Sequence, residues 1–243
     1  MKCRNCTRGR FLIIVVLASA LYFHDELKQI ISTPEVTIKE SYIDGKKESP
    51  TIRYYPDGEI RSKGNIKNAN REGDWVWYFD NGQLKEKGNN KNGKSEGVWV
   101  WYFDNGQLKE KGNYKNGKSE GVWVWYHKNG QLQFKGNYKN DKRVGTVENY
   151  HDNGQMSSKG NYTNGTMDGD WVDYWSNGQL SYKGNYKNSE EEGAWIFYHS
   201  NGQLRRKGNY KNGKKEGAWI HYKRDGTVDK RTGTYKDGKK ISD

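Results

Sequence analysis

Histidine is the side-chain type that most readily holds a metal ion or takes part in acid–base catalysis, and three of the five histidines share one position of a repeat. His127 and His151 occupy equivalent positions in successive units of a 24-residue repeat, and His199 occupies the same position two units further on. Equivalent strands of neighbouring β-hairpins lie about 9.6 Å apart, two strand spacings. Imidazoles bind zinc at about 2.0–2.1 Å, so these three cannot share one ion. We therefore expect no metal site and no cofactor.

Other catalytic groups also lack a suitable arrangement in the sequence. An enzyme needs a few unlike groups that converge on one point, whereas a repeat spreads like groups along a line. No serine or cysteine lies in a nucleophile motif, and the glycines mark turns rather than a phosphate-binding loop. Cys3 and Cys6 are followed by no second ligand pair for zinc. We predict that the protein is not an enzyme.

The elements that carry these residues recur with the same fixed period. Each unit contains an Asn-Gly or Asp-Gly pair, with a tyrosine three positions before it and an apolar residue two positions after the glycine. A period of this length is typical of a repeat architecture. The eight pairs begin at Asp57, Asn81, Asn105, Asn129, Asn153, Asn177, Asn201 and Asp225.

The composition favours a repeat array over a compact domain. Only 32% of the 243 residues are hydrophobic and the net charge is +12, a balance that favours disorder. Aromatic residues in strict register argue against disorder, and an array needs only contacts between neighbouring units. We predict an all-β fold, a single elongated twisted antiparallel sheet of tandem 24-residue β-hairpin repeats without a compact globular core. The lysines recur with the repeat, which indicates a solubilising role.

One unit illustrates the hairpin that we expect. The pair Asn81-Gly82 is typical of a two-residue type I′ turn, because both residues accept positive φ. This turn places Phe79 opposite Leu84 and Trp75 opposite Gly88. We expect the indole of Trp75 to cover the gap that Gly88 leaves on the sheet.

The array is expected to span residues 35–243. It starts with a leading strand, continues with about eight hairpins, and ends in a unit that Thr232 shifts by one position. Between hairpins, segments such as 91–97 are expected to form longer loops. Such a terminal unit is typical of a cap.

The N-terminal segment, residues 1–23, has the features of a targeting sequence. Basic residues precede an apolar run at 11–17, and Ala18-Ser19-Ala20 fits a cleavage site. Extended to Phe23, the apolar run is shorter than the roughly 20 residues of a membrane span. A cleaved signal peptide and a retained signal anchor both remain open, with residues 24–34 as a spacer. We expect export, to a periplasmic, extracellular or inner-membrane location anchored by residues 11–23.

The repeated motifs Asn-Gly-Gln-Leu, Lys-Gly-Asn-Tyr-Lys-Asn-Gly-Lys and Glu-Gly-x-Trp resemble a known repeat. They are similar to the variant MORN repeat proteins of the YwqK-type antitoxin family, over about residues 36–241. The resemblance implies a non-enzymatic sheet that binds another protein, in some members a toxin. Related MORN arrays are associated with membrane attachment and protein scaffolding. This chain differs from a cytoplasmic antitoxin because we expect it to carry an export signal. That difference argues against a toxin partner in the cytoplasm.

Two positions of the repeat vary within a constant frame, and we interpret them as a candidate binding surface. The middle column reads Arg53, Trp77, Trp101, Trp125, Asn149, Asp173, Phe197 and His221. The turn-proximal column reads Tyr55, Phe79, Phe103, His127, His151, Trp175, His199 and Lys223. Architecture alone would hold these positions constant. The candidate partner-binding residues are Trp77, Phe79, Trp101, Phe103, Trp125, Phe134, Trp175 and Phe197. Packing within the sheet is the alternative role for these aromatic residues.

The function expected from these features is that of an exported or membrane-anchored scaffold that binds another protein. An antitoxin or immunity-type protein whose partner is a toxin is a narrower form of this expectation. Two alternatives remain. Spaced tryptophans could stack on the sugars of a cell-surface carbohydrate, or the positive array could bind anionic lipid. We expect no nucleic-acid partner, because export separates the array from nucleic acid.

Overall fold

The computed structural model describes residues 50–243 together with residues 38–39, 42–43 and 46–47. The expected targeting segment 1–23 and spacer 24–34 lie outside the described residues. In the described part of the chain, no helix has the length and apolar character needed to cross a membrane.

The described elements are all β-strands, and most hairpins repeat the same two strand lengths. The strands are β1 (Ile38–Lys39), β2 (Tyr42–Ile43), β3 (Lys46–Lys47), β4 (Thr51–Tyr54), β5 (Ile60–Lys67), β6 (Asn70–Tyr78), β7 (Leu84–Lys91), β8 (Lys94–Tyr102), β9 (Leu108–Lys115), β10 (Lys118–Tyr126), β11 (Leu132–Lys139), β12 (Lys142–Tyr150), β13 (Met156–Thr163), β14 (Thr166–Tyr174), β15 (Leu180–Lys187), β16 (Glu190–Tyr198), β17 (Leu204–Lys211), β18 (Lys214–His221), β19 (Gly233–Lys236) and β20 (Lys239–Ser242).

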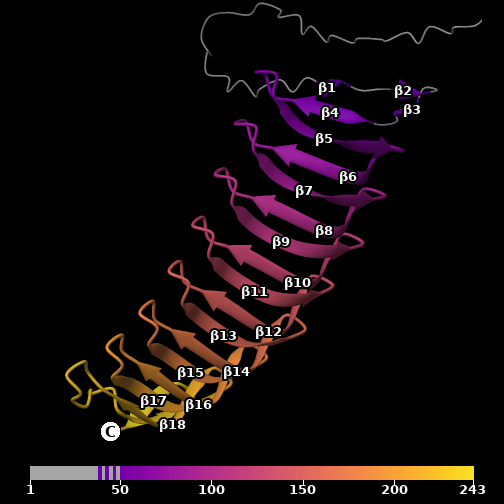
Figure 1. Ribbon diagram of the computed structural model, residues 1–243. Helices are drawn as coiled ribbons and strands as arrows, with labels where there is room; N and C mark the ends of the chain where they lie inside the picture. The colour runs from indigo at the N-terminus through magenta and orange to yellow at the C-terminus, as the bar shows by residue number, and fades with distance from the viewer. Residues whose placement is uncertain (1–37, 40–41, 44–45, 48–49) are drawn as a thin grey trace, which may run out of the picture. The chain divides into compact units, whose positions relative to one another are not determined.

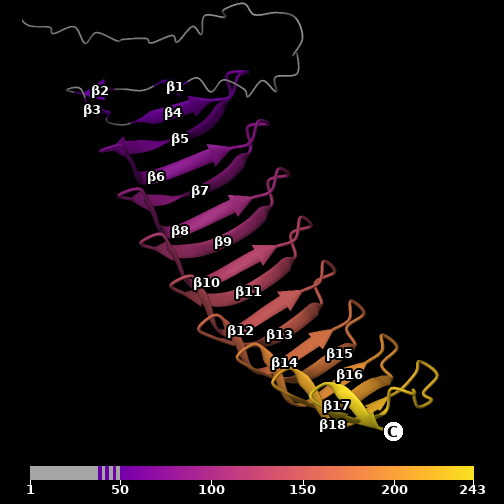
Figure 2. The same cartoon turned by 180° about the vertical axis from the view of Figure 1, so that it is seen from behind.

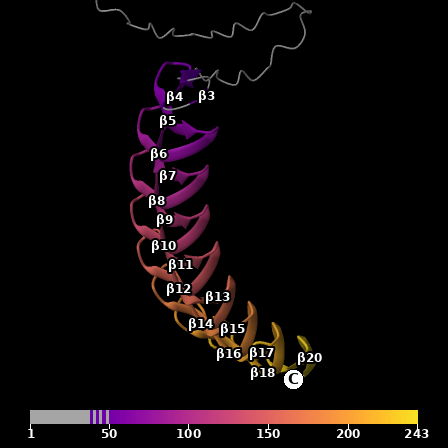
Figure 3. The same ribbon diagram turned by 90° about the vertical axis from the view of Figure 1, so that its right-hand side faces the viewer.

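Strand β1 and strands β4 to β20 form one 18-stranded antiparallel sheet, in which consecutive strands pair (Figure 1). Strands β2 and β3 pair only with each other. The view from behind shows the same unbroken succession of hairpins (Figure 2). The predicted sheet of tandem hairpins is therefore confirmed, and β20 adds a last strand after the eighth hairpin. Figure 3 shows that the strands are bent and that the sheet curves along its length.

The turn at Asn81-Gly82 differs from the predicted type I′ turn. Only Gly82 has positive φ, +78°. The Gly82 amide donates to the Phe79 carbonyl at 3.0 Å, and the Phe79 amide donates to the Gln83 carbonyl at 2.8 Å. These bonds define a three-residue loop, a type I turn followed by a glycine bulge. Tyr78 therefore faces Leu84, and the predicted pairing of Phe79 with Leu84 is wrong.

A second bulge restores the predicted register farther from this turn. Lys85 is the extra residue, because the pairing shifts between Trp77 and Tyr78. Trp77 then faces Glu86 and Trp75 faces Gly88, as the sequence predicted. Two opposite shifts thus cancel close to the turn.

The type I′ turn is present, but in the other connection. Asn92 and Gly93 have φ of +50° and +77°, and Lys91 pairs with Lys94. The longer loop predicted for residues 91–97 is therefore wrong, because β8 already begins at Lys94. Gly97, at φ +68°, lies inside β8 where the pairing with β7 shifts.

Buried tryptophans form the core, and each covers the glycine of the preceding strand. A Cβ added to Gly64 would lie 2.3 Å from the ring of Trp75, and one added to Gly88 would lie 2.2 Å from Trp99. The prediction that Trp75 covers Gly88 is therefore wrong, because the tryptophan of the following strand covers this glycine. The Trp99 indole also donates to the Asn89 carbonyl at 3.0 Å. The column contains Trp75, Trp99, Trp123, Val147, Trp171, Trp195 and Trp219, all at most 8% exposed.

Side-chain hydrogen bonds join each repeat to the next. The Glu96 carboxylate accepts from the backbone amide of Asn116 at 2.8 Å, in the next type I′ turn. The Asn81 side-chain amide donates to the Asp104 carbonyl at 3.2 Å, in the next three-residue loop. These bonds give a reason for the recurrence of the glutamate and the asparagine, since each side chain supports a turn of the next unit.

Candidate functional site

The face that carries the buried tryptophans also carries most of the variable residues. We call it the tryptophan face, and the line of paired residues that crosses its middle is the central row. The central row contains Arg53, Ser62, Trp77, Glu86, Trp101, Glu110, Trp125, Phe134, Asn149, Ser158, Asp173, Tyr182, Phe197, Arg206 and His221.

Alternate members of the central row form the predicted middle column, and the register places further residues between them. Of these, only Phe134 was singled out from the sequence. Glu86, Glu110, Tyr182 and Arg206 were missed, although their position also varies from unit to unit. The pairing of Trp77 with Glu86 was correctly predicted and could have revealed them.

A second line on the tryptophan face lies beside the type I′ turns, and we call it the flanking row. It contains Arg71, Ser95, Ser119, Arg143, Met167, Glu191 and Lys215. Arg71, Arg143 and Lys215 lie over aromatic rings of this face: the Arg71 guanidinium is 5.0 Å from the ring centres of both Trp75 and Trp77. The flanking row varies as widely as the central row.

Two lines across the opposite face are invariant in the matched units. One line repeats lysine, and the neighbouring line repeats asparagine. The lysine row contains Lys63, Lys87, Lys111, Lys135, Lys159, Lys183 and Lys207, all exposed. The asparagine row contains Asn65, Asn89, Asn113, Asn137, Asn161, Asn185 and Asn209. A third line of this face, which pairs with the asparagine row, does vary and contains Asp74, Val98, Val122, Thr146, Asp170 and Ala194. The tryptophan face has two variable lines, and they differ more widely in size and charge.

Near the N-terminal end of the array, the candidate residues Trp77 and Trp101 belong to a zigzag of indole rings. Ring centres are 5.5 Å apart for Trp75 and Trp77, and 5.7 Å apart for Trp77 and Trp99. The series continues from Trp99 to Trp101 at 5.8 Å and from Trp101 to Trp123 at 5.9 Å. Trp77 and Trp101 are half-buried, so they both pack in the sheet and reach its surface.

Two carboxylates of the central row accept hydrogen bonds from tryptophans. The Trp101 indole donates to Glu86 at 2.6 Å, and the Trp125 indole donates to Glu110 at 2.8 Å. Burial raises the pKa of Glu110 above its usual value, although the bond from Trp125 opposes this effect. A half-buried carboxylate beside an aromatic ring is thus repeated in two successive units.

Phe134 lies in the core rather than on the surface. It is 2% exposed and packs with Trp123 and Val147. Its ring stacks on Trp125, with 4.1 Å between the ring centres. In this structure Phe134 supports Trp125 and offers no contact area of its own.

Four members of the turn-proximal column make one repeated structural bond, with the tyrosine carbonyl of the next unit. From the sequence, we expect a structural role to keep the residue type of this column constant. That expectation is wrong here, because tyrosine and histidine side chains both donate this bond. Since a carbonyl only accepts, each histidine donates from Nε2. The donors are Tyr55 to Tyr78 at 2.8 Å, His127 to Tyr150 at 2.9 Å, His151 to Tyr174 at 3.0 Å and His199 to Tyr222 at 3.3 Å.

The aromatic members of the turn-proximal column lie beside the three-residue loops. Phe79 and Phe103 are half-buried, and the ammonium groups of Lys85 and Lys109 lie 5.6 and 5.9 Å from their ring centres. Trp175 is also half-buried. These residues form a separate line from the central row.

A pocket of about 350 Å³ joins the two lines in one place. Phe103 and Trp125 line it, together with Glu110 and His127. Of the eight candidate residues, the structure therefore brings Trp77 and Trp101 together in the indole series and Phe103 and Trp125 together in this pocket. It also stacks the buried Phe134 on Trp125.

The eighth candidate, Phe197, lies in a second aromatic cluster toward the C-terminal end. Its ring centre is 5.7 Å from those of Tyr182 and Trp195. The guanidinium carbon of Arg206 lies 3.9 Å from the centre of the Phe197 ring.

Between the two aromatic regions the central row is polar. The Asn149 amide donates to the Ser158 hydroxyl at 2.8 Å, and burial raises the pKa of Asp173 above its usual value.

The charged groups of the central and flanking rows alternate in sign along the array. They are Arg53 and Arg71, then Glu86 and Glu110, then Arg143, then Asp173 and Glu191, and finally Arg206 and Lys215.

Within the described ranges, no group of three or more histidine, cysteine, aspartate or glutamate residues is placed to hold a metal ion. His127 and His151 instead bond separate backbone carbonyls. The chemistry that the tryptophan face offers is the binding chemistry of aromatic edges, carboxylates and cations.

Comparison with known proteins identifies the repeat. No curated protein matches the chain. The family model of the MORN repeat variant matches seven successive segments, residues 47–68, 71–92, 95–116, 119–140, 143–164, 167–188 and 191–212. These segments cover more than half of the sequence and follow the period of the hairpins, so the chain belongs to the family of MORN repeat variant proteins.

Proposed function

We propose that this protein is a non-enzymatic scaffold that binds another protein on its tryptophan face. The observation that carries the proposal is the contrast between the faces. The lysine and asparagine rows repeat one residue type, whereas the central and flanking rows change from unit to unit. A face that serves only the fold can repeat one solution, and a face that recognises an irregular partner needs different residues along its length.

The chemistry of the tryptophan face supports a protein partner. Tryptophan, tyrosine and arginine are the residue types most often found at the centre of protein interfaces, and they are frequent in the central and flanking rows. The alternation of positive and negative groups would give a partner with the complementary order a preferred register.

The same geometry makes a carbohydrate a weaker candidate. Sugar rings stack on the flat face of an indole, but the flat faces of Trp77 and Trp101 adjoin neighbouring indoles at 5.5–5.9 Å. Mainly their edges remain for a ligand. Edges and paired carboxylates suit the polar and aromatic groups of a protein.

A narrower proposal is an antitoxin or immunity-type role for an exported or membrane-anchored chain. It is supported by the motif resemblance and by the apolar segment at residues 11–17. Co-expression with the product of a neighbouring gene tests it. A complex of the two proteins, together with relief of growth inhibition, is the expected result, and unchanged toxicity would contradict this role.

The general proposal is tested by affinity capture from an extract of the source organism, with three forms of the full chain. The wild type should retain one dominant protein. The pair Trp101→Ala and Trp125→Ala should lose it, and the control pair Lys111→Ala and Lys135→Ala on the opposite face should keep it. Circular dichroism verifies that both variants are folded. The same proteins on all three forms, or no protein on the wild type, would contradict binding by the tryptophan face.

A second candidate function, binding to an anionic lipid surface, is favoured by the lysine row. Among the residues that the structure describes, only Lys159 of this row forms an ion pair, with Glu148 at 3.0 Å. The other six ammonium groups lie exposed, two strand spacings apart. Vesicles with and without anionic lipid would test this function, and binding should weaken as salt increases. Binding that ignores both lipid charge and salt would exclude it.

A further inference from the structure

The C-terminal end of the tryptophan face gathers two cations around one indole. Arg206 lies in β17 and Lys215 in the adjacent strand β18. The Arg206 guanidinium carbon is 5.9 Å from the centre of the Trp219 ring, and the Lys215 ammonium is 4.7 Å from it. We call these two residues the terminal cation pair. Both are partly buried, so neither charge is fully hydrated.

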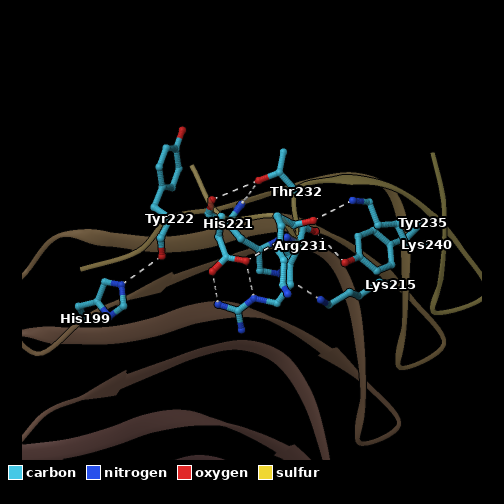
Figure 4. A network of polar contacts seen from close by, with 10 residues as sticks. His199, Lys215, His221, Tyr222, Arg231, Thr232, Tyr235 and Lys240 are labelled. Atoms are coloured by element: carbon cyan, nitrogen blue, oxygen red, sulfur yellow. Dashed lines mark hydrogen bonds and ion pairs between the residues drawn. The ribbon is translucent and has the colours of Figure 1, made fainter. Parts of the chain in front are cut away.

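The terminal cation pair has no counter-ion among the residues that the structure describes. The nearby carboxylate of Asp229 is already bound to another cation, Arg231, whose Nε and terminal nitrogen each lie 2.8 Å from one carboxylate oxygen (Figure 4). Glu191 attracts Arg206 only over a longer distance, without an ion pair. The two charges are therefore left to repel each other and to lose hydration.

Two buried nitrogen atoms at this end also lack hydrogen-bond partners. They are Nε of Arg206 and Nδ1 of His221. His221 as a whole is only 2% exposed. The Lys215 ammonium lies 3.1 Å from Nε2 of His221. Figure 4 draws both side chains. An ammonium only donates, so Nε2 accepts and Nδ1 carries the hydrogen. Buried donors without an acceptor are uncommon in folded proteins.

The electrostatic consequences appear in the neighbouring groups. Burial, Arg206 and Arg231 together lower the pKa of Lys215 from its usual value. Burial lowers the pKa of Arg206 as well. Partly buried like charges that disfavour each other's charged form are typical of a functional site, and here the missing group is one of opposite charge.

We propose that Arg206 and Lys215 form a binding site for a carboxylate of an acidic peptide segment, which the partner of the tryptophan face would supply; this deepens the proposed function and rests on it. The planar guanidinium offers parallel N–H donors that match the two oxygens of a carboxylate. The ammonium adds a second positive charge on the adjacent strand. The rings of Phe197 and Trp219 shield the site from water, which strengthens both interactions.

The site differs from the lysine row of the opposite face. The lysine row is exposed on the opposite face, where water and salt screen each charge. The terminal cation pair lies among aromatic rings and lacks ion pairs within the described part of the chain. A short acidic segment should therefore prefer Arg206 and Lys215 to the more numerous exposed lysines.

The experiment uses the full chain and tetraglutamate, tetraglutamine and tetralysine peptides as probes, with isothermal titration calorimetry as the readout. The wild type should bind tetraglutamate and neither of the other two. The pair Arg206→Gln and Lys215→Gln should weaken this binding by about tenfold or more, as expected for the loss of hydrogen bonds between charged groups. The matched pair Arg205→Gln and Lys207→Gln removes two exposed charges of the same strand and should change the affinity by less than about twofold.

Several outcomes would overturn the site. Equal weakening in the two double variants would mean general attraction to a positive chain, and no binding of tetraglutamate would mean no site. If the variant with Arg206→Gln and Lys215→Gln does not fold, Arg206→Lys provides the test, because it keeps the charge and loses the parallel donors. Unchanged affinity would then count against the site. Loss of protein capture with normal tetraglutamate binding would remove the proposed function and leave the carboxylate site standing.

Discussion

The two faces of the sheet belong to the same strands but differ in how far their residue types repeat from unit to unit. On the opposite face, lysine and asparagine recur in every matched unit, and the central chemistry of one hairpin is that of the next. On the tryptophan face, the buried column is nearly constant while the central and flanking rows change in size, polarity and charge. On this face, each strand therefore carries a residue that the repeat keeps nearly constant beside residues that differ between units.

This difference shows how a one-layer array can fold and still be specific. The tryptophan–glycine contact and the bonds between successive turns supply most of the order, because each involves only neighbouring units. Once these contacts are present, the residues beside them can vary without loss of the hairpin. A compact domain, whose core residues touch many elements, has fewer such positions.

The largest expected difference between the faces concerns Trp99 and its near neighbour Val98. Trp99 is 5% exposed and packs against Gly88, whereas Val98 is 54% exposed. Replacing Trp99 with alanine should lower the free energy of unfolding by about 4 kcal/mol, since it removes a buried ring and leaves a cavity. Val98→Ala should change it by less than about 0.5 kcal/mol. Urea unfolding followed by circular dichroism measures both values, and similar losses would break the contrast.

A smaller loss is expected when the glycine under that ring gains a methyl group. A Cβ at Gly88 would lie 2.2 Å from the Trp99 ring, so Gly88→Ala should destabilise the protein by about 3 kcal/mol through overpacking. Gly121 is the control, because nothing lies within 4 Å of its Cβ position and only its φ of +72° opposes alanine. Gly121→Ala should cost about 1 kcal/mol. Equal costs in urea unfolding would show that backbone strain, rather than the ring, decides both.

Much of this fold could be predicted from the sequence, because the repeat carries its own register. The spacing of Asn81 and Tyr78 located the hairpins, and it correctly paired Trp75 with Gly88. The predicted turn types were wrong, because each unit contains two Asn-Gly or similar pairs. The prediction placed the type I′ turn at Asn81-Gly82, whereas it lies at Asn92-Gly93. Asn81 follows an aspartate and accepts negative φ, whereas Asn92 adopts the positive φ of the type I′ turn.

The errors at the candidate site follow from those at the turns. With residues 91–97 placed in a loop, β7 and β8 have no predicted register, and the contact of Gly88 with Trp99 cannot be seen. For the same reason Glu86 was paired only with Trp77 and not also with Trp101. The burial of Phe134 was unpredictable from its own repeat, because it depends on Val147 replacing a tryptophan in the next unit.

Acid should affect the C-terminal end of the tryptophan face more than the exposed opposite face. Burial, Lys215 and Arg231 lower the pKa of His221 from 6.5 to about 4. The unfolded chain therefore binds a proton at His221 below about pH 6.5, before the folded chain does, and the stabilising effect of the neutral ring is lost as the pH falls from 6.5 to 4. We expect His221 to contribute about 3 kcal/mol to this loss.

The measurement compares the pH dependence of urea unfolding in the wild type and in His221→Gln. The variant should show a shallower decline between pH 6.5 and 4, since glutamine does not titrate. The two curves should run parallel above pH 7. Parallel curves over the whole range would mean that the protonation of His221 is not coupled to folding.

The smallest effect that still separates the faces concerns two glutamates of neighbouring units. Glu86 on the tryptophan face accepts the Trp101 indole hydrogen at 2.6 Å, whereas Glu96 on the opposite face accepts a backbone hydrogen from Asn116 at 2.8 Å. Glutamine can accept either bond but without the negative charge, so each substitution should lower the free energy of unfolding by about 1 kcal/mol. The difference lies in recognition: Glu86→Gln should weaken binding of the protein captured by the wild type, and Glu96→Gln should leave it unchanged. Equal effects on binding would mean that the variable face is not the one that meets the partner.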